Sequence, residues 1–306
     1  MFTIDLSRRS KRRKIKDPLG DKVLYAIVHV VMALLLIVTL YPLIYVLSAS
    51  FSSPQAVSTG QVVLWPVDFS LRGYQEVFDY KVVWIGYRNT SFYTVCGTLI
   101  NVIMTLCAAF ALSKKTLPGC GFFTFLFTFT MLFSAGIVPT YLQMRELGIV
   151  NTVWAMMLPG AISVYNMIVT RTFIQNIPGE LGEAAAIDGC SDFRYFTAIL
   201  LPLSKAVISV ISLYYAVSHW NSYFNAMIYL SDRDMFPLQL FLRDILVLNT
   251  VDASSILDPE EAQALEGMRD LLKYAMIVVS TVPILMVYPF IQKYFAKGVM
   301  VGSVKG

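Results

Sequence analysis

Long apolar runs dominate this sequence and decide what it can fold into. A helix needs about 20 apolar residues to cross the hydrocarbon core of a bilayer. Charged residues make up 14% of the chain, well below the roughly 25% that is usual in soluble domains. We therefore predict an all-α polytopic membrane protein of the cell membrane. Its six transmembrane helices are expected at residues 23–47, 90–112, 122–142, 153–174, 203–230 and 274–295.

The positive charges indicate how these helices are oriented. Lys and Arg gather on the cytoplasmic side of membrane proteins, and with both termini cytoplasmic 16 of the 24 Lys and Arg residues fall inside. The basic run in the first tail could instead bind nucleic acid, but directly before a span it is more typical of a cytoplasmic anchor. The predicted organisation is a cytoplasmic tail (1–22), a first helix with an extracytoplasmic loop (23–89), a five-helix domain (90–295) and a second cytoplasmic tail (296–306).

One polar segment, residues 176–202, interrupts the apolar pattern between the fourth and fifth runs, and we call it the elbow. Its part from Leu181 to Asp188 consists of good helix formers with three consecutive Ala. Gly189 follows where a left-handed C-cap would end the helix. The sequence therefore predicts a short helix at the membrane surface, with side chains small enough to fit closely into a cleft of another protein.

A second short helix is expected directly after the first. Ser191 can cap its start, and Pro202 should stop it after Leu201, because proline is disruptive in a helix interior. The two helices would then meet at an angle. An amphipathic helix that only connects two spans is the alternative interpretation, and residue chemistry alone does not choose between the two.

Taken in register, the elbow residues resemble a known family. The pattern is similar to the cytoplasmic coupling loop of binding-protein-dependent ABC importer permeases of the carbohydrate uptake branch, in particular the second permease subunit of maltose and oligosaccharide systems. Cys190 and Ala206 depart from that pattern, which usually has Ala and a second Pro there. The residues that match, and that the resemblance implies couple to an ATPase, are Glu183, Ala184, Ala185, Asp188, Gly189, Ile199, Leu201 and Pro202.

The resemblance implies a type I ABC importer permease fold with a cytoplasmic coupling helix. It also implies a second permease subunit in a heterodimer, an ABC ATPase dimer, an extracytoplasmic solute-binding protein and membrane lipid as partners. ATP and Mg²⁺ would be bound by the partner ATPase, with no cofactor and no enzyme activity in this chain. In agreement, the sequence has no Gly-x-x-x-x-Gly-Lys-Ser/Thr phosphate loop. The implied activity is ATP-driven import of a carbohydrate, an oligosaccharide above all.

The predicted spans contain few ionisable residues, since only His29 and His219 lie deep within them. Ion-coupled transporters need buried titrating groups such as carboxylates. A secondary carrier or channel is therefore the weaker alternative. A non-transporting membrane receptor, with the polar loop 48–88 as its ligand platform, is a further one. Uptake measured with and without ATP separates the three hypotheses.

Aromatic and amide side chains follow His219 at the end of the fifth apolar run. Trp and Tyr rings can stack on sugar faces, and Asn offers both a donor and an acceptor to hydroxyl groups. Such side chains can equally hold helices together inside a bundle. The resemblance also leaves open whether this subunit or its partner contacts the sugar. The sequence shows no metal-binding pattern, and the candidate substrate-path residues are Trp220, Asn221, Tyr223 and Asn225, with Tyr214 and Tyr215 as weaker candidates.

Overall fold

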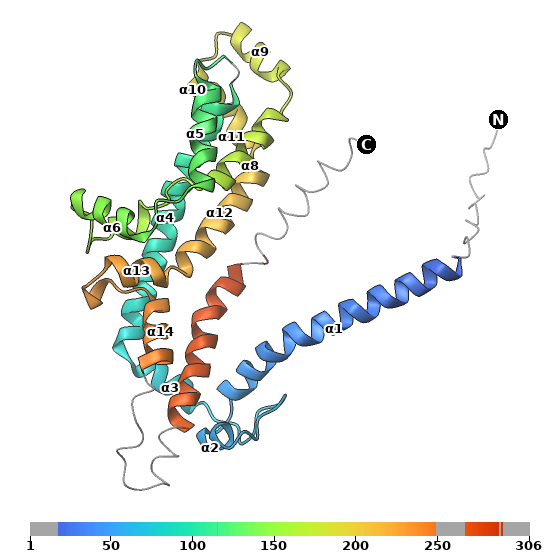
Figure 1. Ribbon diagram of the computed structural model, residues 1–306, viewed down its shortest axis with the longest axis vertical. Coiled ribbons are helices and arrows are strands. Elements are labelled where there is room, and N and C mark those ends of the chain that lie inside the picture. Colours follow the sequence, from blue (N-terminus) through green and yellow to red (C-terminus); the bar gives the residue numbers. More distant parts are fainter. Residues whose placement is uncertain (1–17, 115, 249–266, 288, 290–306) are drawn as a thin grey trace, which may run out of the picture.

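The computed structural model describes residues 18–114, 116–248, 267–287 and 289, and this part of the chain contains helices but no β-strand (Figure 1). Most of the basic tail and the whole of tail 296–306 lie outside these ranges. The helices are α1 (Leu19–Ser50), α2 (Pro54–Ser58), α3 (Arg72–Asp79), α4 (Lys81–Ser113), α5 (Cys120–Leu132), α6 (Ile137–Glu146), α7 (Trp154–Met157), α8 (Val164–Gln175), α9 (Glu180–Ile187), α10 (Asp192–Arg194), a π-helical turn (Tyr195–Leu200), α11 (Leu201–Leu203), α12 (Lys205–Trp220), α13 (Tyr223–Tyr229), a 3₁₀ turn (Arg233–Met235), α14 (Leu238–Leu248) and a last helix at Gly267–Val287.

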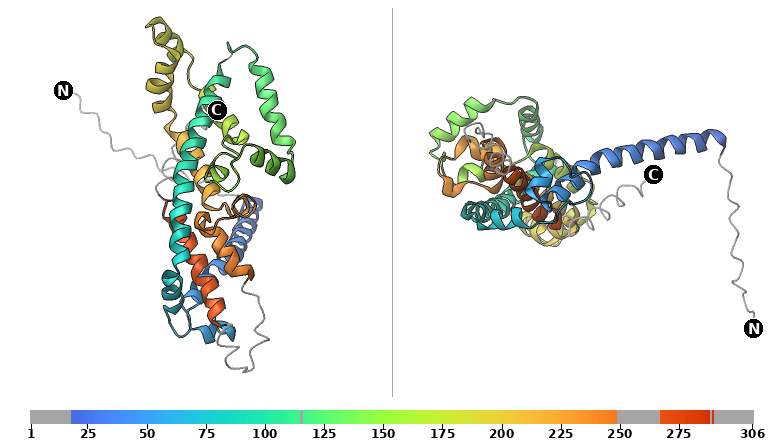
Figure 2. Two further views of the ribbon diagram at one scale, coloured as in Figure 1. Left: turned by 90° about the vertical axis from the view of Figure 1, so that its left-hand side faces the viewer. Right: turned by 90° about the horizontal axis from the view of Figure 1, so that it is seen from below.

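Helix α4 is the central element of the fold. Its 33 residues span about 50 Å at 1.5 Å per residue, and it runs along the length of the bundle in Figures 1 and 2. Its buried residues recur every three or four positions, as expected for a helix with one face turned to a core. That face packs against α8, α12 and α14.

The start of α4 lies well before the span predicted from residue 90. The helix begins at Lys81, and its first turns pack against α14. Gly86 makes this possible, because a Cβ atom there would lie only 2.9 Å from the Cα atom of Leu238. The polar Arg88 finds a partner at the edge of the bundle, where its Nη2 donates to the carbonyl of Asp234 at 3.3 Å. Tertiary contacts thus extend the helix through residues that are too polar to predict as a span.

Three of the described helices are long and apolar enough to cross a membrane alone: α1, α4 and the last helix. Two further candidates are bent pairs, and with each pair as one span the number rises to five. The predicted span 122–142 is such a pair, with 119° between α5 and α6 (Figure 2). The break lies at residues 133–136, where Gly136 has φ +86°. Pro139 lies in the first turn of α6, where a proline removes no helical hydrogen bond.

The predicted spans 153–174 and 203–230 are not continuous helices either. Residues 158–163 separate α7 from α8, and this break contains Pro159 and Gly160, the latter with φ +72°. Helix α12 ends at Trp220, and α13 begins three residues later. Non-helical backbone at membrane depth occurs where it is buried in protein or lines a cavity. Both breaks lie beside the cavity described below.

Helix α1 leads away from the other helices (Figures 1 and 2). Only its last three residues are buried, although the helix is apolar enough to cross a membrane. These three anchor it: Ser48 Oγ donates to the carbonyl of Leu64 at 2.6 Å, and Ala49 joins a small core with Val57 and Val62. The rest of α1 therefore offers its apolar surface to lipid or to other chains.

Candidate functional site: the elbow and a polar cavity

The first helix of the elbow, α9, ends as its sequence predicts. Gly189 has φ +71°, which is accessible to glycine at little cost. Its N–H donates to the carbonyl of Ala186 at 3.1 Å, and the N–H of Cys190 donates to the carbonyl of Ala185 at 2.9 Å. These two bonds form a Schellman motif, which satisfies carbonyls left free at a helix end. The reversal of the chain at Gly189 is therefore fixed by local hydrogen bonds.

The second helix of the elbow starts as expected but continues past Pro202. The hydroxyl of Ser191 accepts from the N–H of Arg194 at 3.4 Å. The helical path then runs to Leu203 and turns by 82° before α12. Pro202 was expected to stop the helix, and this expectation was wrong. A π-helical turn precedes it, in which the N–H of Leu201 donates to the carbonyl of Phe196. Pro202 then falls at the start of α11, where a missing N–H is tolerated.

The elbow carries apolar side chains that nothing in the described chain covers. Ile187 is 86% exposed and Phe193 is 76% exposed. In α9 only Ala185 is buried, while Glu183 and Ala184 are exposed, as is Asp188 directly after the helix. The remaining matched residues of the pattern lie on the second helix. Of these, Ile199 and Leu201 are half-buried and Pro202 is exposed. Gly189, at the turn between the two helices, is also exposed.

The elbow is attached to the end of α4. Phe110 packs against Phe196, with ring centroids 5.0 Å apart, and against Tyr195 at 6.4 Å. The ammonium group of Lys114 lies 4.9 Å from the centroid of the Phe110 ring and forms an ion pair with Asp192. A movement of the elbow would therefore act directly on α4.

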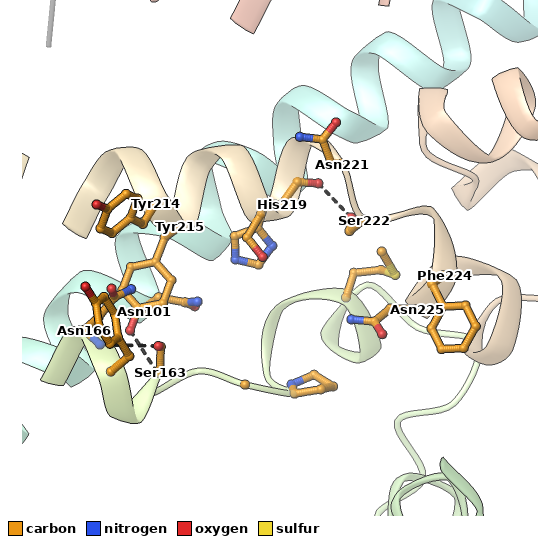
Figure 3. A pocket seen from close by; sticks show the side chains of 15 residues that line it. Asn101, Ser163, Asn166, Tyr214, Tyr215, His219, Asn221, Ser222, Phe224 and Asn225 are labelled. Atoms are coloured by element: carbon orange, nitrogen blue, oxygen red, sulfur yellow. Dashed lines mark hydrogen bonds between the residues drawn. The ribbon is translucent and has the colours of Figure 1, made fainter. Parts of the chain in front are cut away.

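A cavity of about 640 Å³ lies farther along α4, between α8, α12 and the two chain breaks (Figure 3). It is lined mainly by amide, hydroxyl and aromatic groups, and none of the described residues around it is an acid, a lysine or an arginine. The lining residues are Asn101, Met156, Pro159, Gly160, Ser163, Tyr165, Asn166, Tyr214, Tyr215, Ser218, His219, Asn221, Ser222, Phe224 and Asn225.

Tyr215 holds the cavity wall together. Its hydroxyl shares a 2.6 Å hydrogen bond with Thr105 Oγ1 on α4 and accepts from the backbone N–H of Ser163 at 2.9 Å. One side chain of α12 thus fixes both α4 and the irregular segment before α8. Buried polar groups normally have such partners, so this hydroxyl has a structural role.

His219 is seated against the backbone of α4. A Cβ atom at Gly97 would lie 2.5 Å from both Cε1 and Nε2 of the imidazole, so only glycine fits there. The His219 side chain is buried, and its Nε2 has no hydrogen-bond partner in the described chain. Gly97 is therefore the residue that lets α12 approach α4 at the level of the cavity.

The four candidate substrate-path residues are placed differently from one another. Asn221 and Asn225 line the cavity, but the Nδ2 of Asn221 donates to its own helix at the carbonyl of Val217, 2.8 Å away. Trp220 is buried, and its Nε1 donates to the carbonyl of Ser280 at 2.9 Å. Tyr223 packs beside Phe224 and is not among the lining residues.

Sequence reasoning missed several lining residues, notably Asn101, Ser163 and Asn166. A signal for the first was present, because Thr90, Thr94, Thr98, Asn101 and Thr105 recur at helical spacing along one apolar run. The described residues hold no group of three or more His, Cys, Asp or Glu placed to bind a metal ion.

The sequence matches the family described as "Binding-protein-dependent transport system inner membrane component" over residues 15–301. The chain belongs to this family. The polygalacturonan/rhamnogalacturonan transport system permease protein YtcP of Bacillus subtilis (strain 168) is 39% identical over 292 residues, which cover 95% of this chain and 100% of the relative. Protein LplC of the same organism is 38% identical over 275 residues, covering 88% and 90%.

A solved structure shows that this family member has the fold of a known ABC transporter chain. The crystal structure of a bacterial ABC transporter involved in the import of the acidic polysaccharide alginate contains a chain with TM-score 0.83 and 34% identity. The match covers 92% of this chain and 99% of that one. The family and the helical permease fold predicted from the elbow are confirmed. This binding-protein-dependent permease is a multi-pass membrane protein.

Proposed function

We propose that this chain is one permease subunit of an ATP-driven ABC importer, and that it helps to move an oligosaccharide through the cavity. A second permease subunit completes the pathway as a heterodimer. An ATPase dimer binds ATP and Mg²⁺, and an extracytoplasmic solute-binding protein delivers the sugar. In this proposal the chain holds no cofactor, catalyses no reaction and has both termini in the cytoplasm.

The observation that carries the proposal is that one helix connects the elbow with the cavity. Phe110 and Lys114 at the end of α4 contact the elbow, and Asn101 on the same helix lines the cavity. Phe110 and Asn101 are nine positions apart, which corresponds to about 14 Å along the helix axis. Farther along, Thr90 Oγ1 accepts from the N–H of Leu238 at 2.8 Å. A displacement at the elbow therefore reaches the cavity and the far end of the bundle through one rigid element.

The mechanism that follows is alternating access. Closure of the ATPase dimer moves the elbow, which fits into a cleft of the ATPase through its small and apolar side chains. Ile187 and Phe193 are suited to such a contact, because large exposed apolar side chains on a polar segment mark protein interfaces. The coupling residues of this proposal are the eight matched residues, with Glu183 and Asp188 as the polar contacts.

The substrate class is supported by the relatives and by the chemistry of the cavity. One relative has a name that refers to polygalacturonan and rhamnogalacturonan, and the solved relative belongs to a transporter of alginate, an acidic polysaccharide. The cavity of this chain offers amide and hydroxyl groups for sugar hydroxyls, and its described lining has no carboxylate that would repel a uronic acid. Oligosaccharides that contain uronic acids are therefore the first substrates to test.

The test is uptake by the reconstituted complex. The chain is co-expressed with the subunits that co-purify with it, placed in proteoliposomes with the binding protein, and given labelled trigalacturonate. We expect uptake with ATP and none without ATP or in liposomes that lack this chain. Uptake that survives the removal of ATP would indicate a secondary carrier or channel. Binding without any carbohydrate uptake would indicate a receptor.

A further inference from the structure

Two buried amides on the cavity wall are left without hydrogen-bond partners. Asn101 on α4 is 3% exposed and Asn166 on α8 is 5% exposed, and both line the cavity. Within the described chain neither side-chain amide forms a hydrogen bond, and Oδ1 of Asn101 is fully buried and unpaired. A polar group that is removed from water without a partner destabilises the fold. Such groups in a native structure call for an explanation.

Two other polar side chains of the cavity wall, those of Tyr215 and Asn221, are already engaged. The hydroxyl of Tyr215 bonds to Thr105 and Ser163. Asn221 donates to Val217 and accepts from Gln239. The Nε2 edge of His219, which also has no hydrogen-bond partner in the described chain, packs against Gly97 on α4.

We propose that Asn101 and Asn166 form an amide pair that binds ring hydroxyl groups of the transported saccharide, and that this pair determines substrate specificity. The inference rests on the proposed function. It places the amides that bind the sugar on α4 and α8, whereas the sequence pointed to Trp220 at the end of α12 and to Asn221, Tyr223 and Asn225 after it.

The chemistry of an amide selects a hydroxyl over a carboxylate at this position. An Asn side chain has a donor and an acceptor, and a hydroxyl group also has both, so each satisfies the other. A carboxylate has only acceptors and would leave the Asn101 oxygen unpaired. For a uronic acid the hydroxyl edge of the ring therefore faces this pair, and the carboxylate is directed to another part of the cavity.

The experiment compares Asn101→Leu and Asn166→Leu with Thr98→Val in the reconstituted complex. Leucine keeps the branched shape and the number of side-chain heavy atoms of asparagine and removes the amide. Thr98 is the matched control, because its hydroxyl is also buried and unpaired on α4 but it does not line the cavity. We expect each Leu variant to raise KM for trigalacturonate about tenfold, the equivalent of one hydrogen bond. Thr98→Val should leave KM within about twofold, as expected for a site without substrate contact.

Deoxy analogues separate a direct contact from a structural effect. Trigalacturonates that lack one ring hydroxyl each are compared in wild type and in both Leu variants. We expect one analogue to be transported poorly by wild type and as well as the parent sugar by the variant whose amide reads that hydroxyl. The proposal is overturned if every analogue keeps its wild-type ratio to the parent sugar in both variants, or if Thr98→Val raises KM as much as Asn101→Leu. If wild type transports no carbohydrate, the proposed function fails instead.

Discussion

The elbow and the cavity are held in shape by different parts of the chain. Backbone hydrogen bonds fix the elbow, whereas side-chain hydrogen bonds fix the wall of the cavity. Gly189 and the two bonds of its Schellman motif shape the elbow, while Ile187 and Phe193 stay exposed. Around the cavity the backbone is broken twice, yet Tyr215 and its partners are buried and bonded. The two regions are joined by α4.

This difference indicates what each region is built to meet. Exposed apolar side chains on a fixed backbone are suited to a second protein, since burying them on contact is favourable. Buried polar side chains without partners are suited to a small polar ligand. Substitutions in the elbow should therefore affect coupling, and substitutions at the cavity should affect affinity or stability.

The largest effect is expected from Gly189→Pro in the elbow. Proline fixes φ near −65° and cannot adopt the +71° found here. The Schellman motif would be lost, α9 would no longer reverse at its end, and uptake should fall by roughly two orders of magnitude if coupling depends on this geometry. The measurement is uptake per assembled complex, with membrane insertion checked by protease protection.

Gly189→Ala and Gly179→Ala test the effect of backbone conformation alone, without the proline ring. A Cβ atom would have no neighbour within 4 Å at Gly189 or at Gly179, but only Gly189 has a positive φ. Gly189→Ala should therefore cost about 1–2 kcal/mol of local stability, and Gly179→Ala should be silent. Equal uptake in Gly189→Pro and wild type would contradict the coupling role of the elbow.

The next effect in size is expected from Glu183→Lys. Glu183 and Glu180 both lie in the first turn of α9, where a negative charge favours the helix. Glu183→Lys and the control Glu180→Lys each remove this favourable negative charge, which is worth about 0.3–1 kcal/mol at an exposed position. Of the two, only Glu183 is among the eight coupling residues, so Glu183→Lys should also abolish the contact with the ATPase and the uptake. Uptake and ATPase activity are measured for both, and an equal loss in Glu180→Lys would refute a specific role for Glu183.

At the cavity, Gly97→Ala should lower stability more than coupling. The added methyl group would lie 2.5 Å from the His219 ring, and overpacking of this kind typically costs about 1–3 kcal/mol. We expect a lower thermal unfolding midpoint of the purified protein and a parallel loss of uptake. Gly97→Ala combined with His219→Ala should recover most of the midpoint, and Gly121→Ala on α5 should not change it, because its Cβ would meet nothing within 4 Å. A combined variant as unstable as Gly97→Ala would show that the imidazole is not the obstacle.

The same contrast explains how much could be predicted from the sequence. The elbow was predictable because its signals are local: Gly189 ends one helix and Ser191 caps the next within a few residues. The error at Pro202 came from a π-helical turn, which shifts the hydrogen-bond register and has no simple sequence signature.

The cavity could not be predicted in the same way, because its residues come from segments far apart in the sequence. Asn101 and Asn166 are 65 positions apart and meet only because α4 packs on α8. Hydropathy placed the spans, but it carries no information on breaks such as that between α5 and α6, where a turn at Gly136 replaces a continuous helix. Trp220 and Asn221 look like sugar ligands in the sequence, yet their side chains bond to Ser280 and Val217.

The smallest effect is expected at the link between the two regions, from Lys114→Met. The ion pair of Lys114 with Asp192 ties α4 to the elbow, but the Asp192 side chain is 80% exposed, so solvent screens the attraction. Pairs of this kind contribute about 0–1 kcal/mol. Phe110, Tyr195 and Phe196 would keep the elbow attached through their ring contacts. Uptake should thus fall less than about threefold. At high salt the difference between Lys114→Met and wild type should shrink further, because salt also weakens the ion pair in wild type.

Two further variants show whether the ion pair itself is responsible. Asp192→Asn removes the ion pair but keeps the contact of Lys114 with the Phe110 ring, so its loss of uptake should be no larger than that of Lys114→Met. The double variant should be no worse than Lys114→Met, because the ion pair is already absent there. Asp270→Asn breaks the comparable ion pair with Lys273 on the last helix, away from the elbow, and should not change coupling of ATP hydrolysis to uptake. A loss of coupling larger than tenfold in Lys114→Met would mean that the charge, and not the aromatic packing, transmits motion from the elbow to α4.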